Sequence, residues 1–121
     1  MKYIDLHTHS TCSDGTFTPS ELVVYAARKG LAAFALTDHD TTDGLSEAAE
    51  TARKYNIEFV PGIEFSTEYQ GHDIHIVGLD INPLQEELAA KLRSFRQNRD
   101  SRNEEMIRLL QTVGGFDITL E

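Results

Sequence analysis

Apolar residues recur along the chain in short periodic blocks that predict alternating strands and helices. Residues 2–7 have the character of a short strand, and Thr18-Pro19-Ser20-Glu21 then supplies an N-cap, a first-turn proline and a capping-box glutamate. Apolar positions repeat at helical spacing up to Gly30, and residues 31–37 form an apolar run typical of a buried strand. Strand, helix and strand in this order predict the βαβ unit of a parallel sheet.

The same pattern continues through the middle of the chain. Thr42 or Asp43 is the expected cap of a second helix, which ends near Tyr55. Three further extended segments follow, at residues 57–60, 63–69 and 74–81. The last two are separated by a Gln70-Gly71 turn and are expected to pair as a hairpin. The sequence therefore predicts an α/β fold with about five strands.

A long helix is predicted for the C-terminal part of the chain. Asn82-Pro83 is a cap followed by a first-turn proline, and the next helix-breaking pair is Gly114-Gly115. Apolar stripes occupy both ends of this segment, but residues 96–105 are all polar. The middle therefore either runs through solvent as one helix or divides the segment into two helices.

Composition and charge narrow the class of protein. The chain has 121 residues, which suits one core, and no apolar stretch approaches the roughly 20 residues that span a bilayer. The single cysteine, Cys12, cannot form an internal disulfide, which fits the cytoplasm. A net charge of −9 argues against a general nucleic-acid coat. Basic residues are nevertheless concentrated at residues 91–108, where a solvated helix face is the simpler interpretation.

Histidines and acids gather where the predicted strands end. His7 and His9 alternate along the first strand, so both imidazoles lie on one side of it and can bind one ion. Further candidates follow the same strand or later ones: Asp14, Asp38, His39, Asp40, Glu64 and His75. Taken singly, Asp14 would be a turn residue, Asp40 a helix cap and His75 a half-buried histidine. Together they predict a metal site, and imidazole with carboxylate ligands suits manganese, zinc or iron.

Four motifs in order carry a family resemblance. They are Asp5-Leu6-His7-Thr8-His9-Ser10 with Ser13-Asp14-Gly15, then Leu36-Thr37-Asp38-His39-Asp40, then Pro61-Gly62-Ile63-Glu64-Phe65-Ser66, then His75-Ile76-Val77-Gly78. The chain thereby resembles the PHP (polymerase and histidinol phosphatase) family. The run at residues 14–22 and Gly78-Leu79-Asp80 look most like its branch of 3′,5′-nucleoside bisphosphate phosphatases and 5′-3′ exonucleases of short RNA.

The resemblance implies a distorted (β/α)7 barrel that holds up to three divalent ions, with manganese expected first. By similarity, His7, His9 and Glu64 bind one ion, Glu64 bridges to a second ion bound by His75, and Asp14 and His39 bind the third. Asp38 or Asp40 would orient ligands such as His39, or accept a proton. The sequence has no histidine after His75 to complete the family's ligand set, so we expect the N-terminal portion of a barrel. The expected parts are the first half of the barrel at 1–82, a partly basic long helix at 83–113 and the start of a helical insertion at 114–121.

The implied activity is phosphate-ester hydrolysis by metal-activated water, on a nucleotide or the 5′ end of a short RNA. Histidinol-phosphate phosphatase activity and a non-catalytic, metal-stabilised module are the alternatives. Arg99 and Arg102 lie three residues apart and are expected to hold a substrate phosphate. We expect a small phosphorylated substrate, no membrane and no sequence-specific DNA partner. A half barrel exposes sheet edges and apolar surface, so self-association is also expected.

Overall fold

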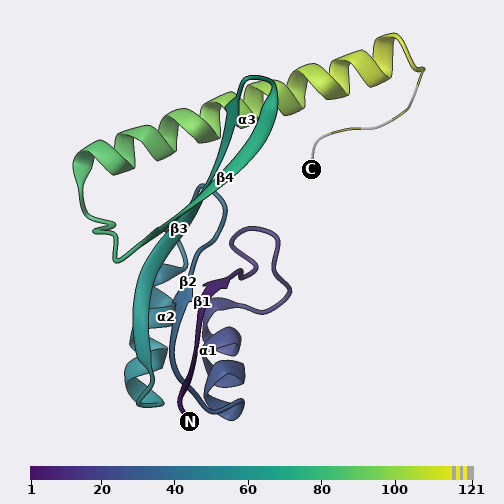
Figure 1. The fold of residues 1–121 in the computed structure, drawn as a ribbon. Helices are drawn as coiled ribbons and strands as arrows, with labels where there is room; N and C mark the ends of the chain where they lie inside the picture. Colours follow the sequence, from purple (N-terminus) through teal and green to yellow (C-terminus); the bar gives the residue numbers. More distant parts are fainter. Residues whose placement is uncertain (116, 118, 120–121) are drawn as a thin grey trace. The chain divides into compact units, whose positions relative to one another are not determined.

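The computed structural model describes residues 1–115, 117 and 119. The chain divides into two compact units, Met1–Gln85 and Glu86–Glu121. In the first unit, four strands form one sheet in the order β1-β2-β3-β4 (Figure 1). Its elements are β1 (Tyr3–Thr8), α1 (Pro19–Arg28), β2 (Leu31–Leu36), α2 (Leu45–Lys54), β3 (Glu58–Tyr69) and β4 (His72–Leu79). The α/β class predicted from the sequence is confirmed.

The first βαβ unit forms as predicted. The Thr18 hydroxyl accepts a hydrogen bond from the Glu21 amide, and the Glu21 carboxylate accepts one from the Thr18 amide, which completes a capping box at the start of α1. The helix ends before Gly30, whose φ of 77° is the left-handed conformation that glycine adopts without strain. Strand β2 then pairs in parallel with β1.

Both helices of the first unit pack into a single core. Val23 and Ala26 of α1 meet Ala48 of α2 over Phe34 and Leu36 of β2, and all five residues are buried. Because Phe34 and Leu36 are two residues apart on a strand, they point to the same face of the sheet. This core fixes the end of β2, from which Asp38 and His39 continue.

The start of α2 corrects the sequence prediction. Neither Thr42 nor Asp43 caps this helix: its N-cap is Gly44, and no side chain caps the helix there. A β-carbon at Gly44 would lie within 3.2 Å of atoms in Pro19, Leu36 and Cys12, so the chain approaches its neighbours too closely for a larger residue.

The prediction of about five strands is also wrong in the described part of the chain, because residues 57–60 and 63–69 belong to one strand. Strand β3 runs through Pro61 and Gly62 without a break. Pro61 is the last residue that pairs with β2, and Gly62 is the first that pairs with β4. The Pro-Gly pair therefore marks a change of partner strand. The predicted hairpin with its Gln70-Gly71 turn is confirmed, since β3 and β4 are antiparallel.

In the second unit, α3 (Glu86–Thr112) is one continuous helix of 27 residues. It begins after a turn in which the Asn82 side chain accepts a hydrogen bond from the Leu84 amide, so Asn82-Pro83 precedes the helix without starting it. The polar segment 96–105 does not divide the helix and is exposed almost throughout. The predicted helix start at 114–121 includes residues 116, 118, 120 and 121, which lie outside the described residues.

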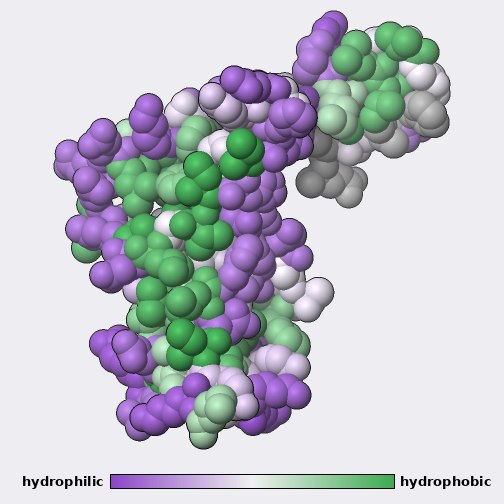
Figure 2. Space-filling view, viewed as in Figure 1, coloured by the Kyte–Doolittle hydropathy of each residue, from purple (hydrophilic) through white to green (hydrophobic). Residues whose placement is uncertain are grey.

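Apolar side chains also reach the surface of the first unit. Tyr3 and Ile4 of β1 and Ile76 of β4 are each more than half exposed. Figure 2 shows apolar residues gathered on one face of the molecule between polar borders. In the described part of the chain, no helix is both long and apolar enough to cross a membrane.

Candidate metal centre

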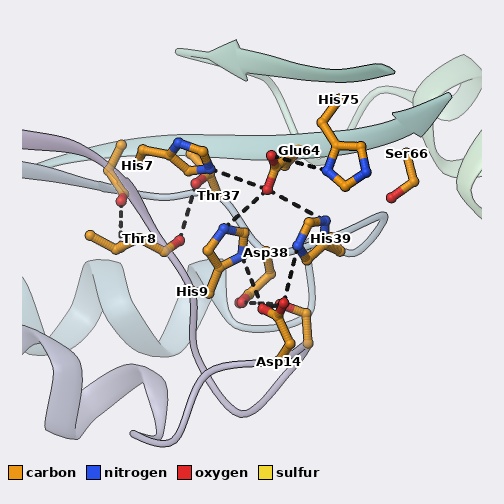
Figure 3. A network of polar contacts seen from close by, with 12 residues as sticks. His7, Thr8, His9, Asp14, Thr37, Asp38, His39, Glu64, Ser66 and His75 are labelled. Carbon is orange, nitrogen blue, oxygen red and sulfur yellow. Dashed lines mark hydrogen bonds and ion pairs between the residues drawn. The ribbon is translucent and has the colours of Figure 1, made fainter. Parts of the chain in front are cut away.

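The six residues predicted as metal ligands come together in the first unit, although they belong to separate segments of the chain. His7 lies on β1 and His9 follows it, Asp14 lies in the next loop, and His39 follows β2. Glu64 lies within β3 and His75 within β4. Figure 3 shows these side chains pointing toward one another. Their ligand atoms form three groups, each within 4.8 Å: His7–His9–Glu64, His9–Asp14–His39 and His39–Glu64–His75.

The carboxylate of Glu64 is the centre of this arrangement. Its Oε2 atom lies 3.2 Å from His7 Nε2, 3.0 Å from His9 Nε2 and 3.4 Å from His39 Nδ1. Its Oε1 atom lies 3.4 Å from His75 Nδ1. The Glu64 side chain is only 6% exposed, so one buried carboxylate faces four imidazoles with its two oxygens divided between them.

The surroundings of Glu64 favour its charged form. Burial by itself raises the pKa of this carboxyl group. The contact with His7 and the positive charge available on His39, His7 and His9 act in the opposite direction and together outweigh burial, so the pKa lies below its ordinary value. Glu64 therefore presents an ionised carboxylate, which is the form that binds a cation.

Asp14 completes the second group from a more exposed position. Its Oδ1 atom lies 3.4 Å from His9 Nδ1, and its Oδ2 atom lies 3.3 Å from His39 Nε2. The two imidazoles stack with their centroids 4.5 Å apart, whereas the Asp14 side chain is 66% exposed. His9 and His39 thus each belong to two groups, and solvent reaches the centre on the Asp14 side.

Three buried atoms of the centre fit a bound cation. His9 Nδ1, His39 Nδ1 and Glu64 Oε2 are buried and have no hydrogen-bond partner. Buried polar atoms without partners are rare because each costs free energy, and those in native proteins commonly belong to functional sites. Imidazole nitrogen and carboxylate oxygen are ligands for divalent transition metals. The residues present therefore fit the divalent-metal centre that the sequence predicts.

Asp38 holds the loop that carries Asp14. Its carboxylate accepts hydrogen bonds at 2.6 Å from both the amide and the hydroxyl of Ser10, and one at 2.7 Å from the Ser13 hydroxyl. Asp38 is 2% exposed and Ser10 is fully buried. These contacts direct the Asp38 carboxylate to the loop between β1 and α1. Sequence reasoning missed both serines as partners, although each stands within a quoted motif.

The strand-end description of the site needs correction. The expectation that the candidate ligands gather where strands end is wrong for Glu64 and His75, because both lie inside the strands of the β3–β4 hairpin. His72 pairs with Tyr69 at the far end of this hairpin and belongs to none of the three groups. Arg99 and Arg102 lie on α3, in the second unit, and their role stays a prediction.

Fold and ligand geometry together define an α/β protein whose histidines and carboxylates converge on a candidate divalent-metal centre. The chain belongs to the PHP domain family, whose profile matches residues 5–120. The family resemblance predicted from the four motifs is confirmed.

Relatives of known name share most of this chain. It is 46% identical over 114 residues to the 3′,5′-nucleoside bisphosphate phosphatase of Chromobacterium violaceum, covering 94% of this chain and 40% of that protein. It is 37% identical over 118 residues to the 5′-3′ exoribonuclease Rnm of Escherichia coli, covering 93% and 40%. The chain thus spans about two fifths of the length of these relatives.

Solved structures share the fold. A Bifidobacterium adolescentis protein described as a metal-dependent phosphoesterase matches with a TM-score of 0.86 and 33% identity, over 98% of this chain and 41% of that one. An amidohydrolase of C. violaceum, solved with bound sulfate and no metal, matches with a TM-score of 0.84 and 47% identity, over 92% and 39%.

Proposed function

We propose that the protein is a metal-dependent phosphoesterase that hydrolyses a phosphate ester of a nucleotide or of the 5′ end of a short RNA. The observation that carries this proposal is the buried Glu64 carboxylate, which faces four imidazoles while its Oε2 atom lacks a hydrogen-bond partner. The names of the relatives, a bisphosphate phosphatase and an exoribonuclease, support the substrate class.

Each proposed ligand set lies within one of the three groups. His7, His9 and Glu64 would hold one ion, Glu64 and His75 a second, and Asp14 and His39 a third. His9 and His39 each belong to two groups, so either imidazole could bind an ion in one group or the other. When bound, divalent ions supply Lewis acidity toward phosphate oxygens and lower the pKa of a bound water. Manganese is the proposed resident ion, with zinc and iron as alternatives, because all three accept this ligand set.

The chain's own residues leave room for a substrate at the centre. The side chains of His7, Asp14 and His75 are 52%, 66% and 47% exposed, whereas that of Glu64 is 6% exposed. The Glu64 carboxylate would bind the ions from the buried side of the centre, and His7, Asp14 and His75 border solvent. A catalytic metal site needs such an open side for water and substrate.

Two further parts of the proposal concern substrate and setting. Arg99 and Arg102 would bind a second phosphate by charge-assisted hydrogen bonds, because both lie on α3 three residues apart. We also propose a cytoplasmic location and self-association through the exposed apolar surface of the first unit, for which Tyr3, Ile4 and Ile76 are the support.

Metal content and phosphate release test this function. The purified protein is stripped with a chelator, equilibrated with Mn²⁺, desalted and assayed for metal by elemental mass spectrometry. Phosphate release is then followed from a 3′,5′-bisphosphorylated nucleoside, from a short 5′-phosphorylated RNA and from histidinol phosphate.

We expect Mn²⁺-stimulated release from the nucleotide or RNA substrate, and its loss in His7→Ala. His72→Ala is the matched control, since His72 is an exposed histidine outside the three groups. Faster turnover of histidinol phosphate would favour that activity instead. Bound metal without turnover of any of the three would identify a non-catalytic metal-stabilised module.

A further inference from the structure

We infer that Asp40 is a positioning residue that fixes His39 opposite Glu64 in the metal centre. This inference rests on the proposed function, because it assigns Asp40 a part in building the same centre. Asp40 is 5% exposed and lies next to His39, just beyond the end of β2. Its contribution comes from two features, its backbone conformation and the acceptor on its side chain.

The backbone around His39 is locked to Glu64 after β2 has ended. The Glu64 amide donates to the Asp38 carbonyl at 3.1 Å, and the Asp40 amide donates to the Glu64 carbonyl at 3.0 Å. These two bonds form an isolated parallel bridge between His39 and Glu64. The bridge sets both ligands at one register, with His39 Nδ1 3.4 Å from Glu64 Oε2. The Asp40 amide supplies one of these two bonds, so the bridge ends where the chain turns at Asp40.

That turn uses a conformation that few residues adopt. Asp40 has a φ of 53°, in the left-handed region where aspartate, asparagine and glycine are enriched and other residues are disfavoured. Its side chain then accepts a hydrogen bond from the Ser66 amide at 3.0 Å. Aspartate and asparagine combine a tolerance for this conformation with a short side chain that carries an acceptor. The positive φ and the hydrogen bond to the Ser66 amide therefore both explain why an aspartate stands at position 40.

The Ser66 bond extends the effect of Asp40 to a further ligand. Ser66 lies directly opposite His75 in the β3–β4 ladder, and it is two residues from Glu64 on the same strand. Asp40 is thus fastened to β3 at Glu64 and at Ser66. Figure 3 shows Ser66 near the imidazole of His75, its partner in this ladder. The Asp40 turn therefore holds His39, Glu64 and His75 in one arrangement.

The three ligand groups depend on Asp40 to different degrees. His39 belongs to the His9–Asp14–His39 and His39–Glu64–His75 groups but not to the His7–His9–Glu64 group. A change at Asp40 should therefore weaken metal binding at two groups and spare the third. Substituting a residue that orients a metal ligand typically lowers affinity about 10- to 100-fold.

A series of substitutions separates the two features of Asp40. Asp40→Asn keeps the left-handed tendency and an acceptor, Asp40→Gly keeps only the backbone freedom, and Asp40→Ala keeps neither. Asp80→Ala is the matched control, because Asp80 is also an aspartate with a positive φ, 55°, but is exposed and belongs to none of the three groups.

Two measurements are made on each variant, after circular dichroism has shown that it folds. The first is hydrogen exchange of the Ser66 and Asp40 amides in the metal-free protein. The second is a Co²⁺ titration followed by visible absorption, which counts and characterises bound ions without any turnover. Asp40→Asn, the variant that keeps both features, provides the folded comparison if Asp40→Ala does not fold.

We expect Asp40→Asn and Asp80→Ala to match the natural protein within about threefold in both measurements. In Asp40→Gly, the Ser66 amide should exchange at least about tenfold faster, while the backbone amide of residue 40 stays protected. Asp40→Ala should accelerate both amides and lose about 10- to 100-fold in Co²⁺ affinity at two of the three groups.

Unchanged amide exchange in both Asp40→Gly and Asp40→Ala would overturn the inference, as would a loss of Co²⁺ affinity in Asp80→Ala equal to that in Asp40→Ala. If Asp40→Ala does not fold, unchanged exchange and Co²⁺ affinity in Asp40→Gly alone would overturn it. A natural protein that binds no Co²⁺ would contradict the proposed function, and the amide exchange rates would then still decide whether Asp40 sets the His39–Glu64 bridge.

Discussion

Replacing Asp38 by alanine tests how the loop that carries Asp14 is held. The substitution leaves the amide and hydroxyl of Ser10, both buried, and the part-buried Ser13 hydroxyl without their acceptor. A buried donor without a partner costs about 1–3 kcal/mol, and a donor that water reaches costs less. Two buried donors and one partly accessible donor give an expected loss of about 3–5 kcal/mol in the free energy of unfolding. This is a large share of the stability of a small domain.

Asp38→Asn should cost far less, for a reason that the geometry supplies. Its carbonyl oxygen would replace Oδ1, which accepts from the Ser10 amide and the Ser13 hydroxyl. Its amide group would replace Oδ2 and donate to the Ser10 hydroxyl oxygen, whose proton is then free to rotate away. The strengthening that comes from the negative charge is lost, and the buried Ser10 proton loses its acceptor, whereas the Ser10 amide and the Ser13 hydroxyl keep theirs, so we expect a cost of about 1–2 kcal/mol.

The assay is urea unfolding of the metal-free protein, followed by Mn²⁺ titration of each variant. Asp73→Ala is the control, because Asp73 is an exposed aspartate on β4, and surface changes usually alter stability by no more than about 0.5 kcal/mol. Equal destabilisation by Asp38→Asn and Asp38→Ala would refute the hydrogen-bond argument. If Asp38→Asn keeps stability and Mn²⁺ binding but abolishes phosphate release, the role of Asp38 is to accept a proton in the reaction, in addition to holding the loop.

Three further predictions concern Glu64 and the basic helix. Glu64→Gln should reduce bound Mn²⁺ to the single group that lacks Glu64, measured by elemental mass spectrometry, and retention of every ion would contradict the central role of this carboxylate. Because the folded pKa of Glu64 is below its ordinary 4.5, its charge stabilises the metal-free protein above that pH, and this contribution is lost as the pH falls through the lower folded value. Between about pH 5 and 3 the natural protein should therefore lose more unfolding free energy than Glu64→Gln does, and equal losses would exclude the effect. Arg99→Ala should raise the KM for a 3′,5′-bisphosphorylated nucleoside about tenfold and that for an aryl phosphate little, with Arg93→Ala as control; equal effects on both substrates would remove Arg99 from phosphate binding.

Local signals in the sequence were sufficient for much of the fold. The capping box at Thr18 and Glu21 is a contact between residues three apart, so the sequence contains all of its parts. The prediction failed where distant contacts decide the outcome. Pro61-Gly62 has the composition of a break, but β3 continues through it because β2 pairs on one side of this point and β4 on the other. Gly44 likewise begins α2 because of its close neighbours in space.

For the site, too, the sequence predicted which residues are ligands but not how they are arranged. The motifs indicated which residues are ligand candidates, since histidine and carboxylate side chains stand at strand-like positions. The spacing could not show that His9 and His39 each belong to two groups, because that depends on how four strands and a loop converge. It also could not reveal that Asp38 binds Ser10 and Ser13, which are 28 and 25 residues away. The positive φ of Asp40 has no signature in a single sequence beyond the residue type itself.

The supports of the ligands differ in a way that bears on how the centre would work. Glu64 is held on both sides, by the bridge to His39 and by its antiparallel pairing with Val77 of β4. Asp14 lies in a loop that is joined to Asp38 by the Ser10 and Ser13 hydrogen bonds, and its side chain is 66% exposed. A buried, doubly paired carboxylate can keep its ligand geometry without metal, whereas an exposed loop carboxylate can shift by small rotations. The first unit therefore combines a preorganised Glu64 side with an adaptable Asp14 side, and Asp14 is the most exposed of these ligands, so the substrate of the proposed reaction would meet the adaptable side.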